Sequence, residues 1–158
     1  MANNRWIKPA AVGALAIASG IVGHFEGSRT KAYLDPVGIP TICSGHILGV
    51  KMGDTATAMQ CDQTLQADLK VYLAYVDGHT AYKEPDSRRA ALTSFCFNVG
   101  TAACGTSTTF RLLNARPGRD VKGACMAMNR WVYAGGRILP GLVARRKDES
   151  DLCLEGLQ

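Results

Sequence analysis

The chain has 158 residues, of which 47% are hydrophobic and 20% are charged. These are ordinary values for a soluble globular protein, and the chain is long enough to bury a core without a structural metal or dense cross-linking. The formal net charge of +5 favours polyanionic partners such as nucleic acid, anionic lipid or anionic cell-wall polymers. Because no long run of Lys and Arg is interleaved with aromatic residues, we expect no nucleic-acid partner.

The N-terminal segment combines a basic start with an apolar stretch. Residues 9–23 carry no charge and follow Arg5 and Lys8. This order is typical of a secretory signal, but the stretch is shorter and richer in Ala and Gly than a committed membrane span. Three interpretations stay open: a weak anchor that exports the chain uncleaved and is later released, a buried first helix of the domain, and a cleaved signal peptide. The releasable anchor is favoured, because no clear cleavage site precedes residues 24–26.

The next part of the chain predicts a small β-containing lobe followed by a long helix. Residues 10–27 read as a helix interrupted by small residues, and residues 30–50 contain the turn signals of a short β-hairpin. Apolar residues then recur at three- and four-residue intervals beyond Thr57. Either Thr55 or Thr57 is expected to cap this long helix.

The C-terminal half predicts a mostly helical lobe. The first expected helix begins at Pro85-Asp86 and ends near Gly100, and a short second one lies around Phe110. A third helix is expected over residues 119–131, and residues 140–153 are expected to form one further helix or two. Gly135-Gly136 is expected to form a turn. The whole chain, 1–158, is therefore expected to be one α+β, mostly helical domain of two lobes, with a cleft between the lobes as a natural ligand site.

Two carboxyl groups near the expected cleft suggest acid–base chemistry. Glu26 ends the apolar helix beside Phe25, where partial desolvation would favour the neutral form that a general acid requires. Asp35 lies in a turn before Pro36, a more solvated setting that should keep it ionised. Such a pair is the working machinery of a glycosidase, although two acids nine positions apart are weak evidence alone.

The segment from Glu26 to His46 has the pattern E-G-x-R-x-x-A-Y-x-D-x-x-G-x-x-T-x-x-x-G-H. This pattern resembles the catalytic segment of the phage-type lysozymes, glycoside hydrolase family 24. The resemblance continues in order through Phe97-Asn98-Val99-Gly100, residues 112–114, residues 130–136 and residues 141–146. It spans nearly the whole chain, and it implies a lysozyme-like two-lobed fold.

The resemblance also implies a reaction and roles for three residues. Glu26 would be the catalytic acid, and Asp35 and Thr41 would hold or activate the water. The implied reaction is hydrolysis of the β-1,4 bond between N-acetylmuramic acid and N-acetylglucosamine in peptidoglycan, with host cell lysis as the outcome. We expect a monomer that needs no cofactor and no metal.

Further polar and aromatic residues of the matched motifs have competing interpretations. His46 is expected to be structural, paired with an acid or a backbone carbonyl, with a pH-tuned role as the alternative. Asn98 supports the cleft or merely ends a helix. Core packing is expected for Trp131 and Tyr133 rather than stacking on sugars. Arg145 and Arg146 are expected to be solvated or paired surface charges.

Six scattered cysteines favour an oxidising compartment over six buried cytosolic thiols, and none shows C-x-x-C spacing. Cys43 stands where the soluble members of the resembled family often have Gly. Cys61, Cys125 and Cys153 resemble cysteines of its membrane-released, signal-arrest-release subclass. Six cysteines allow fifteen pairings, and proximity in sequence suggests three local disulfides: Cys43–Cys61, Cys96–Cys104 and Cys125–Cys153.

The expected localisation is the periplasmic face of the host inner membrane and then the periplasm. The membrane is a transient partner of the N-terminal segment, and a holin is a functional partner without direct contact. Two other functions stay open. A lytic transglycosylase typically needs one Glu and no partner Asp, so Asp35 and Thr41 favour hydrolysis. A non-enzymatic protein that binds the wall or disrupts membranes would need only the charge and the apolar segment.

Overall fold

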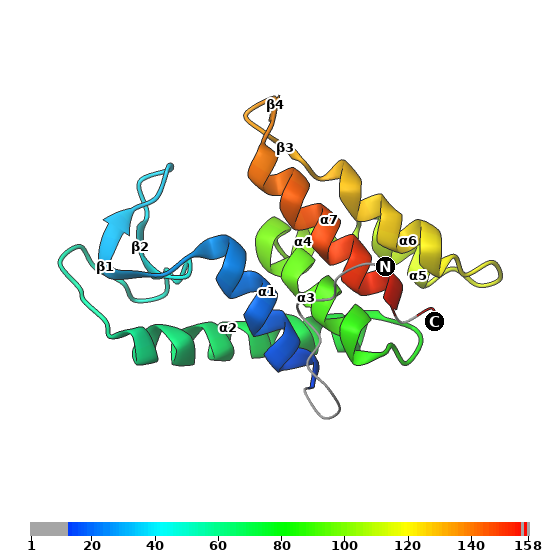
Figure 1. Cartoon of the computed structure of the whole chain (residues 1–158), viewed down its shortest axis with the longest axis horizontal. Coiled ribbons are helices and arrows are strands. Elements are labelled where there is room, and N and C mark those ends of the chain that lie inside the picture. Colours follow the sequence, from blue (N-terminus) through cyan, green and yellow to red (C-terminus); the bar gives the residue numbers. More distant parts are fainter. Residues whose placement is uncertain (1–12, 156, 158) are drawn as a thin grey trace.

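The structure, a computed structural model, describes residues 13–155 and residue 157. Figure 1 shows an elongated molecule with a small β-lobe at one end, joined by a long helix to a larger helical lobe. The elements of the small lobe and its connections are α1 (Ala14–Glu26), β1 (Arg29–Leu34), β2 (Pro40–Cys43) and α2 (Ala58–His79). Those of the helical lobe are α3 (Asp86–Val99), α4 (Thr101–Gly105), α5 (Thr108–Leu113), α6 (Val121–Ala127), a 3-10 turn (Met128–Arg130), β3 (Tyr133–Ala134), β4 (Arg137–Ile138) and α7 (Pro140–Glu155).

The expected two-lobed, mostly helical fold is confirmed, with corrections at the boundaries. The helix expected over 119–131 is a short α-helix that tightens into a 3-10 turn, and residues 140–155 form one helix rather than two. α4 was not predicted, because five residues are too few to show helical periodicity. The expected Gly135-Gly136 turn joins two-residue strands, and both glycines have positive φ.

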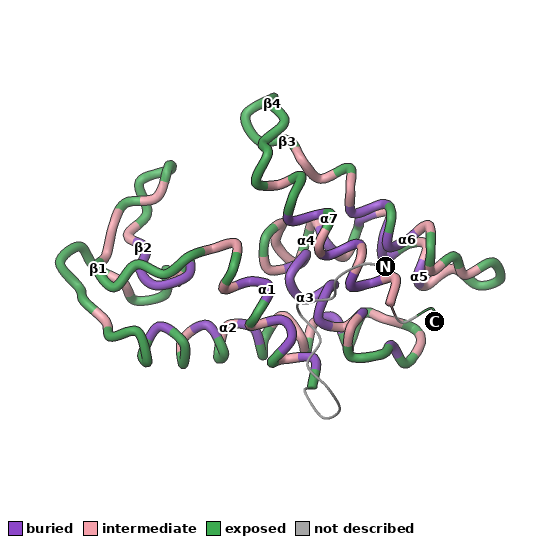
Figure 2. The backbone as a smooth tube through the Cα atoms, viewed as in Figure 1, coloured by how far each residue is buried: buried purple, intermediate pink, exposed green. Residues whose placement is uncertain are grey.

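The core lies where α3 packs against α1, α2 and α7. Figure 2 shows buried residues along the facing sides of these helices, whereas much of the β1–β2 hairpin is exposed. α1 contributes its apolar face to this core, through Ala14, Ile17, Ala18, Ile21 and Val22. Within the described residues, the apolar N-terminal stretch therefore packs as the first helix, and its residues 9–12 lie outside them. No helix of the described part is long and apolar enough to cross a membrane.

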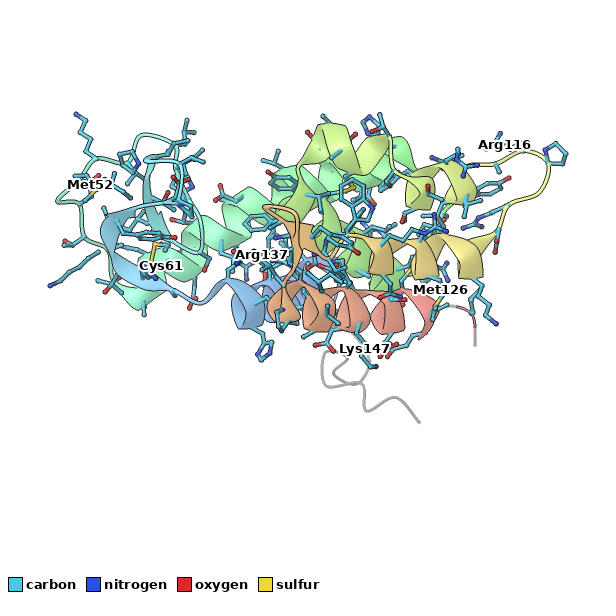
Figure 3. The ribbon with its side chains drawn as sticks, turned by 90° about the horizontal axis from the view of Figure 1, so that it is seen from above. Met52, Cys61, Arg116, Met126, Arg137 and Lys147 are labelled. Carbon is cyan, nitrogen blue, oxygen red and sulfur yellow. A yellow bond between two sulfur atoms is a disulfide. The ribbon has the colours of Figure 1, made fainter. Side chains whose placement is uncertain are left out.

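Three disulfides join the six cysteines in the pairs that sequence proximity suggested. Cys43–Cys61 ties the end of β2 to the first turn of α2, as the side-chain view around Cys61 shows (Figure 3). Cys96–Cys104 joins α3 to α4, and Cys125–Cys153 joins α6 to α7. The first disulfide therefore stabilises the small lobe, and the other two stabilise the helical lobe.

Candidate active site

A cleft of about 380 Å³ lies between the two lobes. It is lined by Glu26, Gly45, His46, Ile47, Leu48, Asp68, Val71, Tyr72, Phe97 and Asn98. Of the predicted site residues, Glu26, His46 and Asn98 thus share one cleft although α1, the loop after β2 and α3 supply them. Asp35 and Thr41 are not among these lining residues and belong to the β1–β2 hairpin.

Glu26 is the last residue of α1, and its side chain is 25% exposed. Gly27 follows with a φ of +65°, a left-handed conformation that glycine adopts without penalty, so the chain leaves the helix at once for β1. The Ser44 hydroxyl donates to the Gly27 carbonyl at 2.8 Å and ties the end of β2 to this turn. The acid is therefore fixed where the helical lobe meets the hairpin.

Arg145 of α7 forms an ion pair with the Glu26 carboxylate through Nη1. The Arg145 side chain is only 4% exposed, and its guanidinium also lies 5.8 Å from the centre of the Phe25 ring. The expected surface position of Arg145 and Arg146 is wrong: both are buried, at 3% and 0% exposure. Both pair with Glu149 three or four residues further along α7, and Arg145 also pairs with Glu26 of α1. Sequence spacing does not reveal that α7 packs these charges against α3 and α1. The reasoning from an apolar helix end missed this cation as a partner of Glu26.

The hairpin holds Asp35 and Thr41 around a shared neighbour, Ile39. The Asp35 Oδ1 atom accepts hydrogen bonds from the backbone amides of Val37 (2.9 Å) and Ile39 (2.8 Å). Thr41 is buried, and its hydroxyl donates to the Ile39 carbonyl at 2.9 Å. Because both backbone donors bind Oδ1, Oδ2 of Asp35 is available to a water, and the oxygen of Thr41 can accept a further hydrogen bond. The two residues are positioned by the same turn.

His46 is engaged at both ring nitrogens. Nδ1 lies 2.8 Å from a carboxylate oxygen of Asp68 on α2, and Nε2 lies 3.1 Å from the Leu48 carbonyl. This geometry agrees with the structural interpretation, in which an acid and a carbonyl orient the ring. Asp68 itself was not predicted, because it is one of several polar residues along a long helix and nothing in the sequence links it to His46.

Two other expectations concern the helical lobe. Asn98 lines the cleft in the last turn of α3, and its Oδ1 accepts a hydrogen bond from Arg146 at 2.9 Å. Trp131 packs edge-on against Phe95 with 5.6 Å between ring centres, as core packing requires. Tyr133 is instead 63% exposed on β3, so its expected place in the core is wrong. A hairpin with strands of two residues is too small to bury the side chains on both of its faces.

Among the described residues, no group of three or more His, Cys, Asp or Glu side chains is arranged to hold a metal ion. The cleft offers two partly buried carboxyl groups, Glu26 with a buried cation behind it and Asp68 paired with His46, and polar side chains around them. These are groups for proton transfer and for hydrogen bonding to a sugar.

Comparison with known proteins places this arrangement in context. The phage lysozyme family model matches residues 23–149. The chain is 42% identical over 152 residues to a SAR-endolysin of Pseudomonas phage phiKMV, covering 94% of this chain and 92% of that protein. It is 39% identical over 153 residues to a SAR-endolysin of Bacteriophage PS119, covering 92% and 90%.

A solved structure of the active form of the P1 phage endolysin Lyz superposes with a TM-score of 0.75 at 27% identity, covering 89% of this chain and 85% of that one. The secreted inactive form of the same endolysin superposes with a TM-score of only 0.51 at 26% identity, covering 70% and 77%. The sequence match, the shared fold and the cleft agree: the chain belongs to the phage lysozyme family.

Proposed function

We propose that Glu26 is the catalytic acid of this chain and that Asp35 and Thr41 hold the attacking water. As a phage lysozyme, the chain is an endolysin muramidase: it hydrolyses the β-1,4 bond between N-acetylmuramic acid and N-acetylglucosamine and so lyses the host cell. The observation that carries the assignment of roles is the Glu26 carboxyl group, half-buried in the cleft and held from behind by Arg145.

In the proposed reaction, Glu26 gives its proton to the glycosidic oxygen as the bond from that oxygen to the anomeric carbon breaks. The Asp35 carboxylate stabilises the positive charge that develops on the sugar ring. Asp35 and the Thr41 hydroxyl orient a water whose oxygen bonds to the anomeric carbon, and Asp35 takes its proton. Their common attachment to Ile39 supports this shared task.

Replacement of the acid tests this assignment. We expect Glu26→Gln to lower the rate of lysis of chloroform-treated cells by at least about a hundredfold, because an amide cannot act as the acid that protonates the glycosidic oxygen at neutral pH. Glu84→Gln is a suitable control, since Glu84 is buried among arginines and does not line the cleft. Lysis by Glu26→Gln at the parental rate contradicts the proposal. Release of new reducing ends agrees with hydrolysis, whereas anhydro-muramyl ends indicate a transglycosylase.

We also propose that the chain is exported to the periplasm and that residues 9–23 serve first as a weak membrane anchor, of which residues 14–23 later pack as part of α1. The similarity to SAR-endolysins supports export. The higher similarity to the active than to the inactive form of the P1 endolysin supports an active conformation with α1 packed in the domain. Since α1 ends at Glu26 and fills the core, a membrane-inserted segment and an intact active site exclude each other.

Cell fractionation tests the export proposal. We expect the full-length chain in the inner membrane first and in the periplasm later, because Gly and Ala in the segment weaken membrane insertion. Mass mapping without reduction should then find the three disulfides in the periplasmic protein. A full-length chain confined to the cytosol, with free thiols, contradicts export without affecting the assignment of Glu26.

A further inference from the structure

A buried cluster of charges lies directly behind the catalytic acid, between α3 and α7. Its centre is Glu149, a fully buried carboxylate on α7. The Glu149 Oε1 atom accepts hydrogen bonds from the Ser94 hydroxyl at 2.6 Å and from Nε of Arg145 at 3.0 Å. The proposed mechanism gives this carboxylate no part, and its burial excludes direct contact with a substrate.

Arg145 connects Glu149 to the acid. Its guanidinium binds Glu149 through Nε and Glu26 through Nη1, while Nη2 donates to the Ser94 carbonyl at 3.3 Å. All three nitrogens of the planar group therefore have a partner, and the group has little freedom to turn. Glu149 thus fixes the side chain that holds the Glu26 carboxylate.

Arg146 connects the same carboxylate to the wall of the cleft. Its Nη2 atom lies 3.2 Å from Oε1 of Glu149 and donates to Oδ1 of Asn98 at 2.9 Å. Its Nε atom lies 2.9 Å from Oε2 of Glu149 as a charge pair, and the guanidinium lies 5.2 Å from the centre of the Phe95 ring. Glu149 is therefore connected to two cleft residues: to Glu26 through Arg145, and to Asn98 through Arg146.

The charge balance of this cluster depends on Glu149. Burial lowers the pKa of Arg146, and the negative charge of Glu149 opposes that effect. Burial likewise raises the pKa of Glu149, and the two arginines oppose that effect. The charged groups facing Glu149 are Arg145 and Arg146 from its own helix and, beyond them, Glu26 from α1; α3 adds the uncharged Ser94 and Asn98. With Glu149 ionised, the two arginines leave one positive charge for Glu26 to balance.

We infer that Glu149 is a positioning residue for the proposed reaction, which holds Arg145 against the catalytic acid and Arg146 against Asn98. This inference rests on the proposed role of Glu26. A carboxylate that only stabilised the fold would affect the folding free energy alone. One that positions and balances these arginines also affects the pH at which the acid loses its proton and the affinity for the glycan.

The test compares Glu149→Gln with Glu84→Gln in the full chain, on purified peptidoglycan. Glu84 is a matched control because it too is a buried carboxylate between two arginines, with Arg88 at 2.7 Å and Arg119 as a second partner. It lies away from the cleft. Both variants should lower stability, since each takes a buried carboxylate away from a buried guanidinium group, Arg88 in one case and Arg146 in the other.

Only Glu149→Gln should alter catalysis. Two uncompensated guanidinium groups favour the ionised form of Glu26, so the basic limb of kcat/KM against pH should move down by about one pH unit. KM should rise at least about threefold as Asn98 loses its orientation. The measurement is release of reducing ends from pH 4 to 9, with rates corrected for the folded fraction.

A second variant keeps the test decisive if Glu149→Gln does not fold. Glu149→Asp retains the charge but shortens the side chain, so the basic limb should stay in place while kcat falls about fivefold or more from misplacement of Arg145. Parental kcat in Glu149→Asp, or equal effects of Glu149→Gln and Glu84→Gln on the pH profile, overturns the inference. If Glu26→Gln is inactive in the same assay, the proposed function survives that result.

Discussion

At the scale of single residues, Cys43 shows how one backbone angle constrains the sequence. Its φ is +57°, which places a non-glycine residue in the left-handed region. This conformation costs an L-residue roughly 1–2 kcal/mol, and it explains why the family resemblance leads one to expect Gly here. The disulfide to Cys61, with the Cα atoms 5.0 Å apart, offsets that cost by cross-linking β2 to α2.

Two double variants separate the conformational cost of the left-handed backbone at residue 43 from the stabilising effect of the disulfide. Both Cys43→Ala/Cys61→Ala and Cys43→Gly/Cys61→Ala lack the disulfide, and they differ only at the left-handed position. We expect the glycine variant to have the higher free energy of unfolding, by about 1 kcal/mol, in urea denaturation. An alanine variant of equal or greater stability would show that the backbone at this position relaxes.

Residue identities revealed the active site only in part. Glu26, Asp35 and Thr41 could be proposed because they stand at fixed offsets in one short segment, and the hairpin does bring the last two to a common turn. Arg145 and Arg146 were misplaced on the surface, because their local pairs with Glu149 are of a kind that exposed helices also form. Their other partners, Glu26 and Asn98, are separated from them by 119 and 48 positions. Such pairing depends on how α1, α3 and α7 pack.

At the scale of elements, α2 illustrates how local signals define a helix. The helix has 22 residues and connects the lobes (Figure 1). The sequence left Thr55 and Thr57 open as its cap, and the structure selects Thr57: its hydroxyl accepts from the Gln60 amide at 3.1 Å, and the Gln60 side chain accepts from the Thr57 amide at 2.7 Å. This reciprocal capping box satisfies two backbone donors that the helix leaves open.

Loss of the cap should be measurable. We expect Thr57→Ala to lower the free energy of unfolding by about 1 kcal/mol. Thr55→Ala is the control, because this neighbouring exposed threonine does not cap the helix and its substitution should change stability by less than about 0.5 kcal/mol. Equal losses in thermal or urea unfolding would contradict the assignment of the cap.

Local signals such as capping residues and terminal glycines made the long helices predictable, whereas the short elements were not. α3 ends at Val99, directly before Gly100, as expected, and Gly100 has a φ of +86°. α4 lasts five residues, and β3 and β4 last two each, too short for any periodicity to show. α4 is held by its contacts with α2, α3 and α5, whereas β3 and β4 contact each other across the Gly135-Gly136 turn.

At the scale of the whole molecule, the buried charged side chains account for little of the net charge of +5. The buried Arg88, Arg145 and Arg146 are paired with the buried carboxylates Glu84 and Glu149. The remaining basic excess is available to attract an anionic cell wall from a distance. Attraction of this kind is screened by salt, with a Debye length of about 10 Å at 0.1 M.

Salt should therefore weaken capture of the substrate rather than the chemical step. Between 20 and 200 mM NaCl, we expect KM on intact anionic walls to rise about threefold or more, with kcat little changed. Uncharged chito-oligosaccharides provide the control, since their KM should not respond. A KM on walls that is independent of salt would show that the net charge has no part in binding.

The direct connection between α1 and β1 determines where this chain tolerates insertions. Only Gly27 and Ser28 separate Glu26, the proposed catalytic acid, from the hairpin, and the hydrogen bond from Ser44 to Gly27 closes the turn. One added residue extends a chain by about 3.3 Å, which exceeds the displacement that positioned acid catalysis tolerates. The exposed loop at 116–118, at the far end of the molecule near Arg116 (Figure 3), is held to residues 81 and 82 through the Arg116 side chain and lies away from the cleft. An affinity tag or a binding peptide therefore belongs in that loop, whereas the two-residue link must keep its length.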